Sequence, residues 1–210
     1  MIAFKTCKYS MIALLFLIPF YMGKAQAVNT VSKTPVFSLN TNLLHDASTL
    51  FLGLSPSMNL GLEFKTGNHV TIKLPVTYNP WEGKDYKKFK FVLVQPELRW
   101  WFCEPFYGSF FGIHAHGAIY NVGAVGTNYM KDYRFQGYLY GAGLSYGHQF
   151  YLAPRWNLEF SIGGGYAYLN FKQYECEHCG RELKNPEEYK SPRNYWGLTQ
   201  ASFTLIYIIK

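Results

Sequence analysis

The feature that most constrains this chain is a period-two alternation of apolar and polar residues. In the stretch MNLGLEFK (58–65), Met58, Leu60, Leu62 and Phe64 alternate with polar residues or glycine. Successive side chains of a strand point to opposite faces, so this pattern predicts a strand with one apolar face. The same pattern predicts further strands at 36–44, 69–78, 90–101, 110–120, 137–150, 156–171 and 197–209.

A glycine triplet interrupts an aromatic run in WNLEFSIGGGYAYLNF (156–171). A phosphate-binding loop leaves a strand and opens a helix with the spacing G-x-G-x-x-G. Here the alternation continues through the glycines, and no helical period follows. The triplet is therefore expected to belong to a strand, which disfavours a nucleotide-binding protein.

The connections between the predicted strands alternate in length. Short connections fall at 66–68, 102–106 and 151–155, and longer ones fall at 45–57, 79–88, 122–135 and 172–194. Short turns at one end and longer loops at the other are typical of outer-membrane barrels. We therefore predict an all-β fold, an eight-stranded antiparallel up-and-down transmembrane β-barrel of the outer-membrane type.

Composition and the directions of the side chains favour a barrel surrounded by lipid. The alternative is a soluble, lipocalin-like ligand binder in the periplasm. Aromatic residues make up 19% of the chain and charged residues only 16%. The apolar faces carry tyrosine and tryptophan near strand ends, as aromatic girdles do. The opposite faces carry a predicted polar network in the lumen: Glu63, Lys65, Lys73, Glu97, Arg99, His114, His116 and Glu159.

The N-terminus is predicted to be an export signal. Lys5 and Lys8 precede the apolar segment MIALLFLIPFYMG, and AQA at 25–27 offers small residues for cleavage. We therefore expect a cleaved signal peptide at 1–27, a short lead at 28–35 and one barrel domain at 36–210. The expected location is the outer membrane, with its lipid as a partner, and no nucleic acid is expected to bind.

Two cysteines, Cys176 and Cys179, frame His178 in the sequence CEHC, within the longest predicted loop. Neighbouring cysteines of an exported protein generally form a disulfide, which is our prediction for this pair. A zinc site is the alternative, although a second pair of ligands at suitable spacing is missing. Cys103 is expected to be an unpaired bystander.

Several segments resemble a known family. These are TNLLHDA, MNLGLEFKTGNHVTIKLPVTYNPW, PELRWWF, GYLYGAGLSYGHQF and NYWGLTQASFTLIYII, and the resemblance spans nearly all of residues 36–210. They are similar to the domain of unknown function 3575 family, exported proteins of Bacteroidetes. The resemblance implies an outer-membrane barrel, with a link to fimbria-type surface systems in some members, and it implies no catalytic residues.

The residues favour a non-enzymatic barrel, a structural or surface-recognition component that acts through its external loops. No catalytic residue, cofactor or metal is predicted, because Ser145 and His148 fall on opposite faces and lack a carboxylate at triad spacing. His114 and His116 are expected to join the polar plug, with a metal or acid–base role as the alternative. A surface protein or a glycan is the expected partner. A lipid-modifying barrel enzyme and a narrow channel are the competing functions.

Overall fold

The computed structural model describes residues 36–51, 57–82, 87–123, 133–175, 182–183 and 191–209. The predicted signal peptide and lead, at 1–35, lie outside this part of the chain. The strands are β1 (Phe37–Asn42), β2 (Met58–Lys65), β3 (Val70–Glu82), β4 (Lys88–Val94), β5 (Glu97–Trp101), β6 (Gly108–Gly123), β7 (Tyr133–Ala153), β8 (Trp156–Glu175) and β9 (Arg193–Ile209). One helix, α1 (Leu43–Phe51), follows β1.

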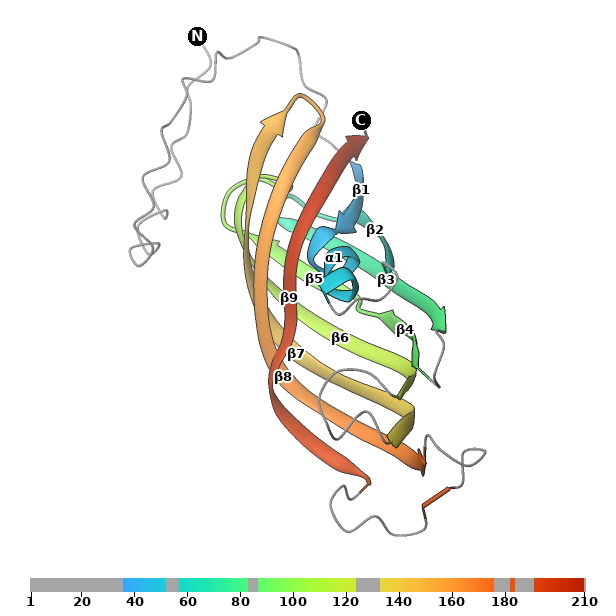
Figure 1. The fold of residues 1–210 in the computed structure, drawn as a ribbon. Helices are drawn as coiled ribbons and strands as arrows, with labels where there is room; N and C mark the ends of the chain where they lie inside the picture. Colours follow the sequence, from blue (N-terminus) through green and yellow to red (C-terminus); the bar gives the residue numbers. More distant parts are fainter. Residues whose placement is uncertain are drawn as a thin grey trace, which may run out of the picture.

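The strands form one closed antiparallel barrel (Figure 1). Apart from β4 and β5, each strand pairs with the next along the chain, and β9 returns to pair with β1, which closes the ring. β4 and β5 lie end to end between β3 and β6, so the nine strands occupy eight positions around the barrel. The predicted eight-stranded up-and-down barrel is confirmed.

A proline divides the strand predicted at 90–101 into β4 and β5. Pro96 has no N–H to donate, so regular pairing stops at Gln95 and Pro96. The register is nevertheless continuous, because Val94 pairs with Val76 while Glu97 pairs with Lys73 on the same neighbour. β4 and β5 are therefore one barrel strand with a local gap in its hydrogen-bond ladder.

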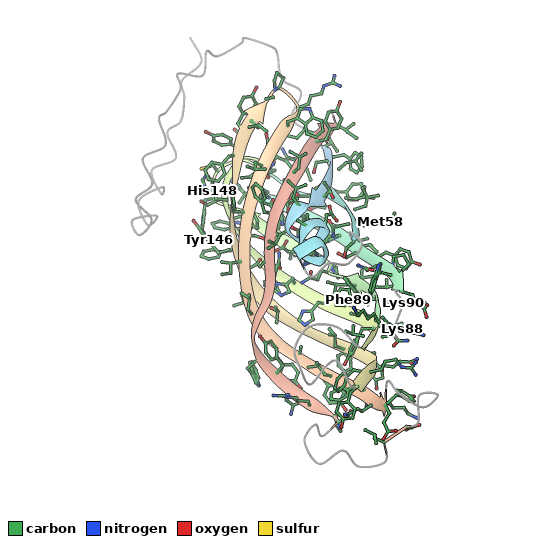
Figure 2. The ribbon with its side chains drawn as sticks, viewed as in Figure 1. Met58, Lys88, Phe89, Lys90, Tyr146 and His148 are labelled. Carbon is green, nitrogen blue, oxygen red and sulfur yellow. The ribbon has the colours of Figure 1, made fainter. Side chains whose placement is uncertain are left out.

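Burial alternates along the strands as the sequence predicts. On β3, Thr71, Lys73 and Thr77 are buried, whereas Ile72 and Leu74 are about 40% exposed (43% and 42%). Polar side chains point into the barrel and apolar side chains point away from it, the reverse of a soluble protein. In Figure 2, Tyr146 and His148 accordingly project from the outer side of β7.

The two ends of the barrel are built differently. The turns after β2, β5 and β7 lie at one end, together with the C-terminus of β9, and we call this the short-turn end (Figure 1). The opposite end is the loop end. β6, β7, β8 and β9 have 16 to 21 residues, whereas β1 and β2 have 6 and 8. One side of the barrel therefore extends further toward the loop end.

Helix α1 occupies part of a segment, 45–57, that was predicted to be a loop. Asn42 caps the helix, because its Oδ1 accepts the N–H of Leu44 at 3.1 Å. Asp46 holds the first turn against β1 and β2, accepting from Thr41 Oγ1 at 2.8 Å and from the Asn59 N–H at 3.1 Å. α1 stands beside β9 and β2, where the short strand β1 has ended (Figure 1). Within the described part of the chain, no helix is long and apolar enough to cross a membrane.

Candidate functional site

A charge layer crosses the lumen near the short-turn end, and Arg99 is its centre. The guanidinium lies 2.8 Å from Glu159 Oε2, 2.7 Å from Glu97 Oε2 and 3.3 Å from Glu63 Oε2. Arg99, Glu63 and Glu159 are fully buried. Arginine suits this position because its planar fork can bind several carboxylates at once.

The remaining oxygens of the charge layer are also bonded. Lys73 Nζ lies 3.0 Å from Glu159 Oε1, and Thr71 Oγ1 donates to Glu63 at 2.6 Å. Ser145 Oγ on β7 donates to Glu97 Oε1. β2, β3, β5, β7 and β8 thus each contribute one or two side chains. A buried charge is tolerated only when it is paired and hydrogen-bonded, and this cluster meets that condition.

An aromatic floor closes the lumen below the charge layer, at the short-turn end. Trp101, Phe106 and Phe110 are at most 2% exposed. Phe110 lies under Arg99, with its ring centroid 4.1 Å from the guanidinium carbon. Phe106 adopts a left-handed backbone (φ 68°), and its carbonyl accepts from Asn157 Nδ2 at 2.9 Å. The loop after β5 therefore folds back under the barrel.

The histidine pair lies in the lumen on the loop-end side of the charge layer. The rings of His114 and His116 are 5.7 Å apart, and both side chains are at least 94% buried (1% and 6% exposed). His114 Nε2 lies 2.9 Å from Thr199 Oγ1 on β9. The pair lies in the lumen, and the ion pairs of the charge layer do not include it.

Glycines on β7 and β8 make room for these rings. A Cβ on Gly143 would lie 2.8 Å from His114 Nε2, and one on Gly163 would lie 3.1 Å from His114 Cε1. A Cβ on Gly165 would fall 2.5 Å from the Gly143 Cα across the ladder. The glycine triplet of β8 is therefore part of a strand. Side chains there would clash with the imidazole ring and with the backbone of the neighbouring strand.

Several polar atoms of the lumen are buried without a hydrogen-bond partner among the described residues. They include Nδ1 of both His114 and His116, and Oε1 of Gln200. Buried polar atoms of this kind generally bind ordered water. Similar atoms lie near the short-turn end, among them Oγ of Ser38 and both amide atoms of Gln149, so both halves of the lumen need water to complete their hydrogen bonds.

Ser145 and His148 do not form a catalytic pair. Ser145 lies inside the barrel against Glu97, whereas His148 lies on the outer wall, where its Nδ1 is 2.8 Å from Ser109 Oγ. Among the described residues, no group of three or more His, Cys, Asp and Glu side chains could hold a metal ion. Ser109 and His148 are thus a hydroxyl and an imidazole within hydrogen-bond distance of each other, on the outer wall.

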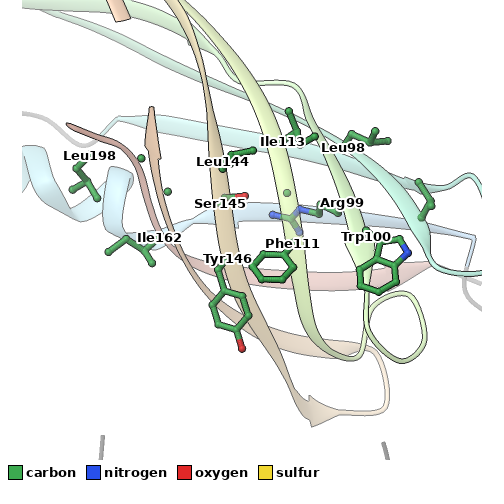
Figure 3. A pocket seen from close by; sticks show the side chains of 14 residues that line it. Leu98, Arg99, Trp100, Phe111, Ile113, Leu144, Ser145, Tyr146, Ile162 and Leu198 are labelled. Atoms are coloured by element: carbon green, nitrogen blue, oxygen red, sulfur yellow. The ribbon is translucent and has the colours of Figure 1, made fainter. Parts of the chain in front are cut away.

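The outer wall carries an apolar belt between two sets of aromatic side chains. Near the short-turn end, Trp156 contacts Tyr207 with ring centroids 4.9 Å apart. Toward the loop end, Tyr166 contacts Trp196, also at 4.9 Å. A shallow groove of about 810 Å³ crosses the belt between them (Figure 3). Its walls are mainly Leu98, Ile113, Leu144, Ile162 and Leu198, with Trp100, Phe111 and Tyr146.

The structure brings together most of the residues predicted for the lumen. Glu63, Lys73, Glu97, Arg99 and Glu159 meet in the charge layer. Lys65 is half-buried at the short-turn end and makes none of these ion pairs. Cys176 and Cys179 lie outside the described residues. Cys103, expected to be unpaired, is disulfide-bonded, because pairing depends on spatial proximity that spacing along the chain does not reveal. The other three cysteines of the chain, Cys7 included, lie outside the described residues.

Sequence reasoning missed the aromatic floor and the contact of Thr199. Phe106 lies in a segment that was predicted to be a turn. Its side chain points into the barrel because of its left-handed backbone conformation. Thr199 is an extra residue on β9, since Gly163 pairs with Gln200 while Gly164 pairs with Leu198. Such a bulge re-aims a side chain, and no local pattern in this sequence marks it.

Comparison with known proteins adds a family and no function. No curated protein and no solved structure matches this chain. The model of one family, described as a protein of unknown function (DUF3575), matches residues 11–209, nearly the whole chain. The protein belongs to this DUF3575 family.

Proposed function

We propose that this protein is a non-enzymatic β-barrel of the outer membrane that serves surface recognition through its loop end. The single observation that carries the proposal is the inverted burial of the barrel wall. Leu60, Ile113 and Leu144 are more than 60% exposed (62%, 61% and 66%), while Glu63, Arg99 and Glu159 are fully buried. Water outside the barrel would favour polar side chains on the outer wall, whereas lipid favours apolar side chains there.

The closed ring supports the same proposal. Lipid cannot hydrogen-bond to backbone groups, so a membrane-spanning sheet has to pair its own edges. β9 pairs with β1 from residue 204 to residue 209, which closes the short-turn half, and α1 stands beside β9 where β1 has ended. The expected signal peptide and the family resemblance agree with export to this membrane.

The lumen argues against a channel. The charge layer and the aromatic floor fill it in succession, and their side chains are nearly inaccessible. Small eight-stranded barrels have interiors that side chains just fill. Conduction would require Arg99 to leave three carboxylates, so we expect no stable conductance in planar bilayers.

The loop end supports recognition as the role of the part outside the membrane. β7 and β8 have 21 and 20 residues, whereas a strand crosses a membrane with about 9–11. Roughly half of each strand is therefore expected to stand beyond the hydrocarbon on the outer side. There the strands carry Lys172, with an exposed side chain paired to Glu182 at 3.1 Å.

Fractionation and labelling of intact cells test the proposal together. The mature protein should resist urea extraction from outer membranes and migrate differently on gels when it is not heated. A membrane-impermeant amine reagent should modify Lys172 in intact cells, and Lys172→Arg should remove that modification. Recovery in the soluble periplasmic fraction would overturn the membrane location, and labelling only after lysis would reverse the orientation.

A further inference from the structure

One edge of β9 has no strand partner at the loop end. From residue 193 to residue 203, β9 pairs with β8 on one side, and no described strand pairs with its other side. Residues 194–198, with the sequence NYWGL, are all exposed, and we call them the free edge. An unpaired edge presents backbone donors and acceptors in a row.

The backbone direction along the free edge follows from one close approach. The Gly197 carbonyl oxygen lies 3.3 Å from where a Cβ on Gly164 would be, so the backbone groups of Gly197 face β8. Alternate residues of an antiparallel strand turn both backbone groups to the same side. Asn194 and Trp196 therefore turn theirs away from the barrel ladder, toward an incoming chain.

The free edge stands at the outer margin of the membrane, an inference that rests on the proposed function. Tyr207 marks the short-turn end, because Trp156 packs on it and Arg155 Nη1 donates to its hydroxyl at 3.0 Å. A crossing strand needs about 9–11 residues, which reaches from Tyr207 to about the level of Leu198. Water and partner proteins can therefore reach the backbone of residues 194–198.

The free edge lacks the usual protection against strand addition. Natural edges are blunted by lysine, by proline or by a bulge, and residues 194–198 contain none of these. Trp196 is 77% exposed and Leu198 56% exposed on the same face. An extended chain added here would gain backbone hydrogen bonds and cover these two apolar side chains.

The β9 strand of a second copy, related by a two-fold axis along the membrane normal, cannot supply the added strand. Strands of such barrels tilt by about 35–45° from the membrane normal. A two-fold axis along the normal would make two β9 strands cross at about 70–90°, twice that tilt. Crossed strands cannot form a ladder, which leaves a differently oriented chain as the partner.

We propose that residues 194–198 are a docking site for an extended segment of another protein, which adds to β9 as an antiparallel strand. Its backbone would pair with Asn194 and Trp196, and its side chains would cover Trp196 and Leu198. This is recognition by β-augmentation, in which main-chain bonds give affinity and alternate side chains give specificity.

Amide exchange with a chain-derived peptide tests the docking site. The probe is an acetylated and amidated peptide of sequence GYAYLN, which copies residues 165–170 of β8, the strand that already pairs with residues 193–197. At ten times its dissociation constant the peptide should slow exchange at Trp196 about tenfold. The matched control is the same peptide with every backbone amide N-methylated, which removes the donors of both edges and should give no protection.

The outcomes separate docking from the proposed location. Protection at Asn194 and Trp196 by the plain peptide alone supports strand addition. Equal protection by both peptides, or none from the plain peptide at millimolar concentration, overturns it. Fluorescent peptide that binds the purified barrel but not intact cells would uphold the docking site while contradicting the outward orientation of the proposed function.

Discussion

At the short-turn end of the barrel each strand has a neighbour on both sides, and the lumen is filled by paired charges and aromatic rings. At the loop end β1 and β2 have ended, and α1 stands beside the open side of β9. The same wall thus contains a half in which the strands are paired on both sides and a half in which β9 has an unpaired edge. Local stability generally follows buried contacts, and functional segments come from the less stable part.

Removal of Arg99 should have the largest effect on this comparison. Arg99→Ala leaves three buried carboxylates without their shared partner, which typically costs about 3–5 kcal/mol. Urea unfolding in detergent, followed by the heat-dependent gel shift, measures the loss. Arg155→Ala, at the exposed turn, is the control and should leave the free energy of unfolding unchanged. Equal stability of Arg99→Ala and the wild type would mean that water fills the lumen, and it would revive the channel.

The same substitution at two depths sharpens the contrast between the halves. Leu74→Arg places a charge near the centre of the apolar belt, where the cost is about 2–4 kcal/mol. Leu198→Arg places it near the outer interface, where the cost is about 0–1 kcal/mol. Folding into lipid vesicles measures both variants against the wild type. Similar losses at both positions would refute the assignment of membrane depth.

Asn59 ties the two halves together where β1 ends. Its Oδ1 accepts the Asn42 N–H at 2.8 Å, and its Nδ2 donates to Thr77 Oγ1 at 2.7 Å. Asn59→Ala leaves buried groups unpaired, at about 1–3 kcal/mol, and should speed amide exchange around α1 without weakening the short-turn end. Asn170→Ala on β8 is the matched control. Faster exchange throughout the barrel would show that the halves unfold as one unit.

The smallest effect is expected from the cysteine pair, outside the described residues. Cys176→Ser with Cys179→Ser should leave the heat-dependent gel shift unchanged, because the predicted disulfide joins residues of one loop. Mass measurement with and without alkylation reports its oxidation state. Loss of the folded band would contradict a role confined to the loop, and two free thiols with stoichiometric zinc would favour the metal alternative.

The sequence predicts the barrel because alternation is local and survives along each strand. The inward direction of the Glu63, Arg99 and Glu159 side chains could be predicted, because residues two apart in a strand share the same face. What each side chain touches depends on the neighbouring strands, so the ion pairs across the lumen could not be assigned. The short helix α1 was missed because nine residues carry little periodicity, and the contact that holds its first turn to β2 comes from distant Asn59.

The end of β1 was also beyond prediction. Its alternation continues to Leu44 in the sequence, yet pairing with β9 stops at Asn42, where the side chain of Asn42 turns to the N–H groups of Leu44 and Phe203. A local side-chain bond thus competes with the ladder and starts a helix instead. The free edge of β9 is a consequence of that switch.

Quenching of two neighbouring tryptophans tests the central claim, that lipid surrounds a barrel with a dry floor. Trp100 is 52% exposed on the outer wall, whereas Trp101 is fully buried in the floor, with its Nε1 donating to Thr71 Oγ1 at 2.9 Å. Two variants, each retaining one of these tryptophans and carrying phenylalanine in place of the others, are folded into vesicles of brominated lipid. Strong quenching of Trp100 with little quenching of Trp101 is the expected result. Equal quenching of both, or stronger quenching of Trp101, would contradict the account.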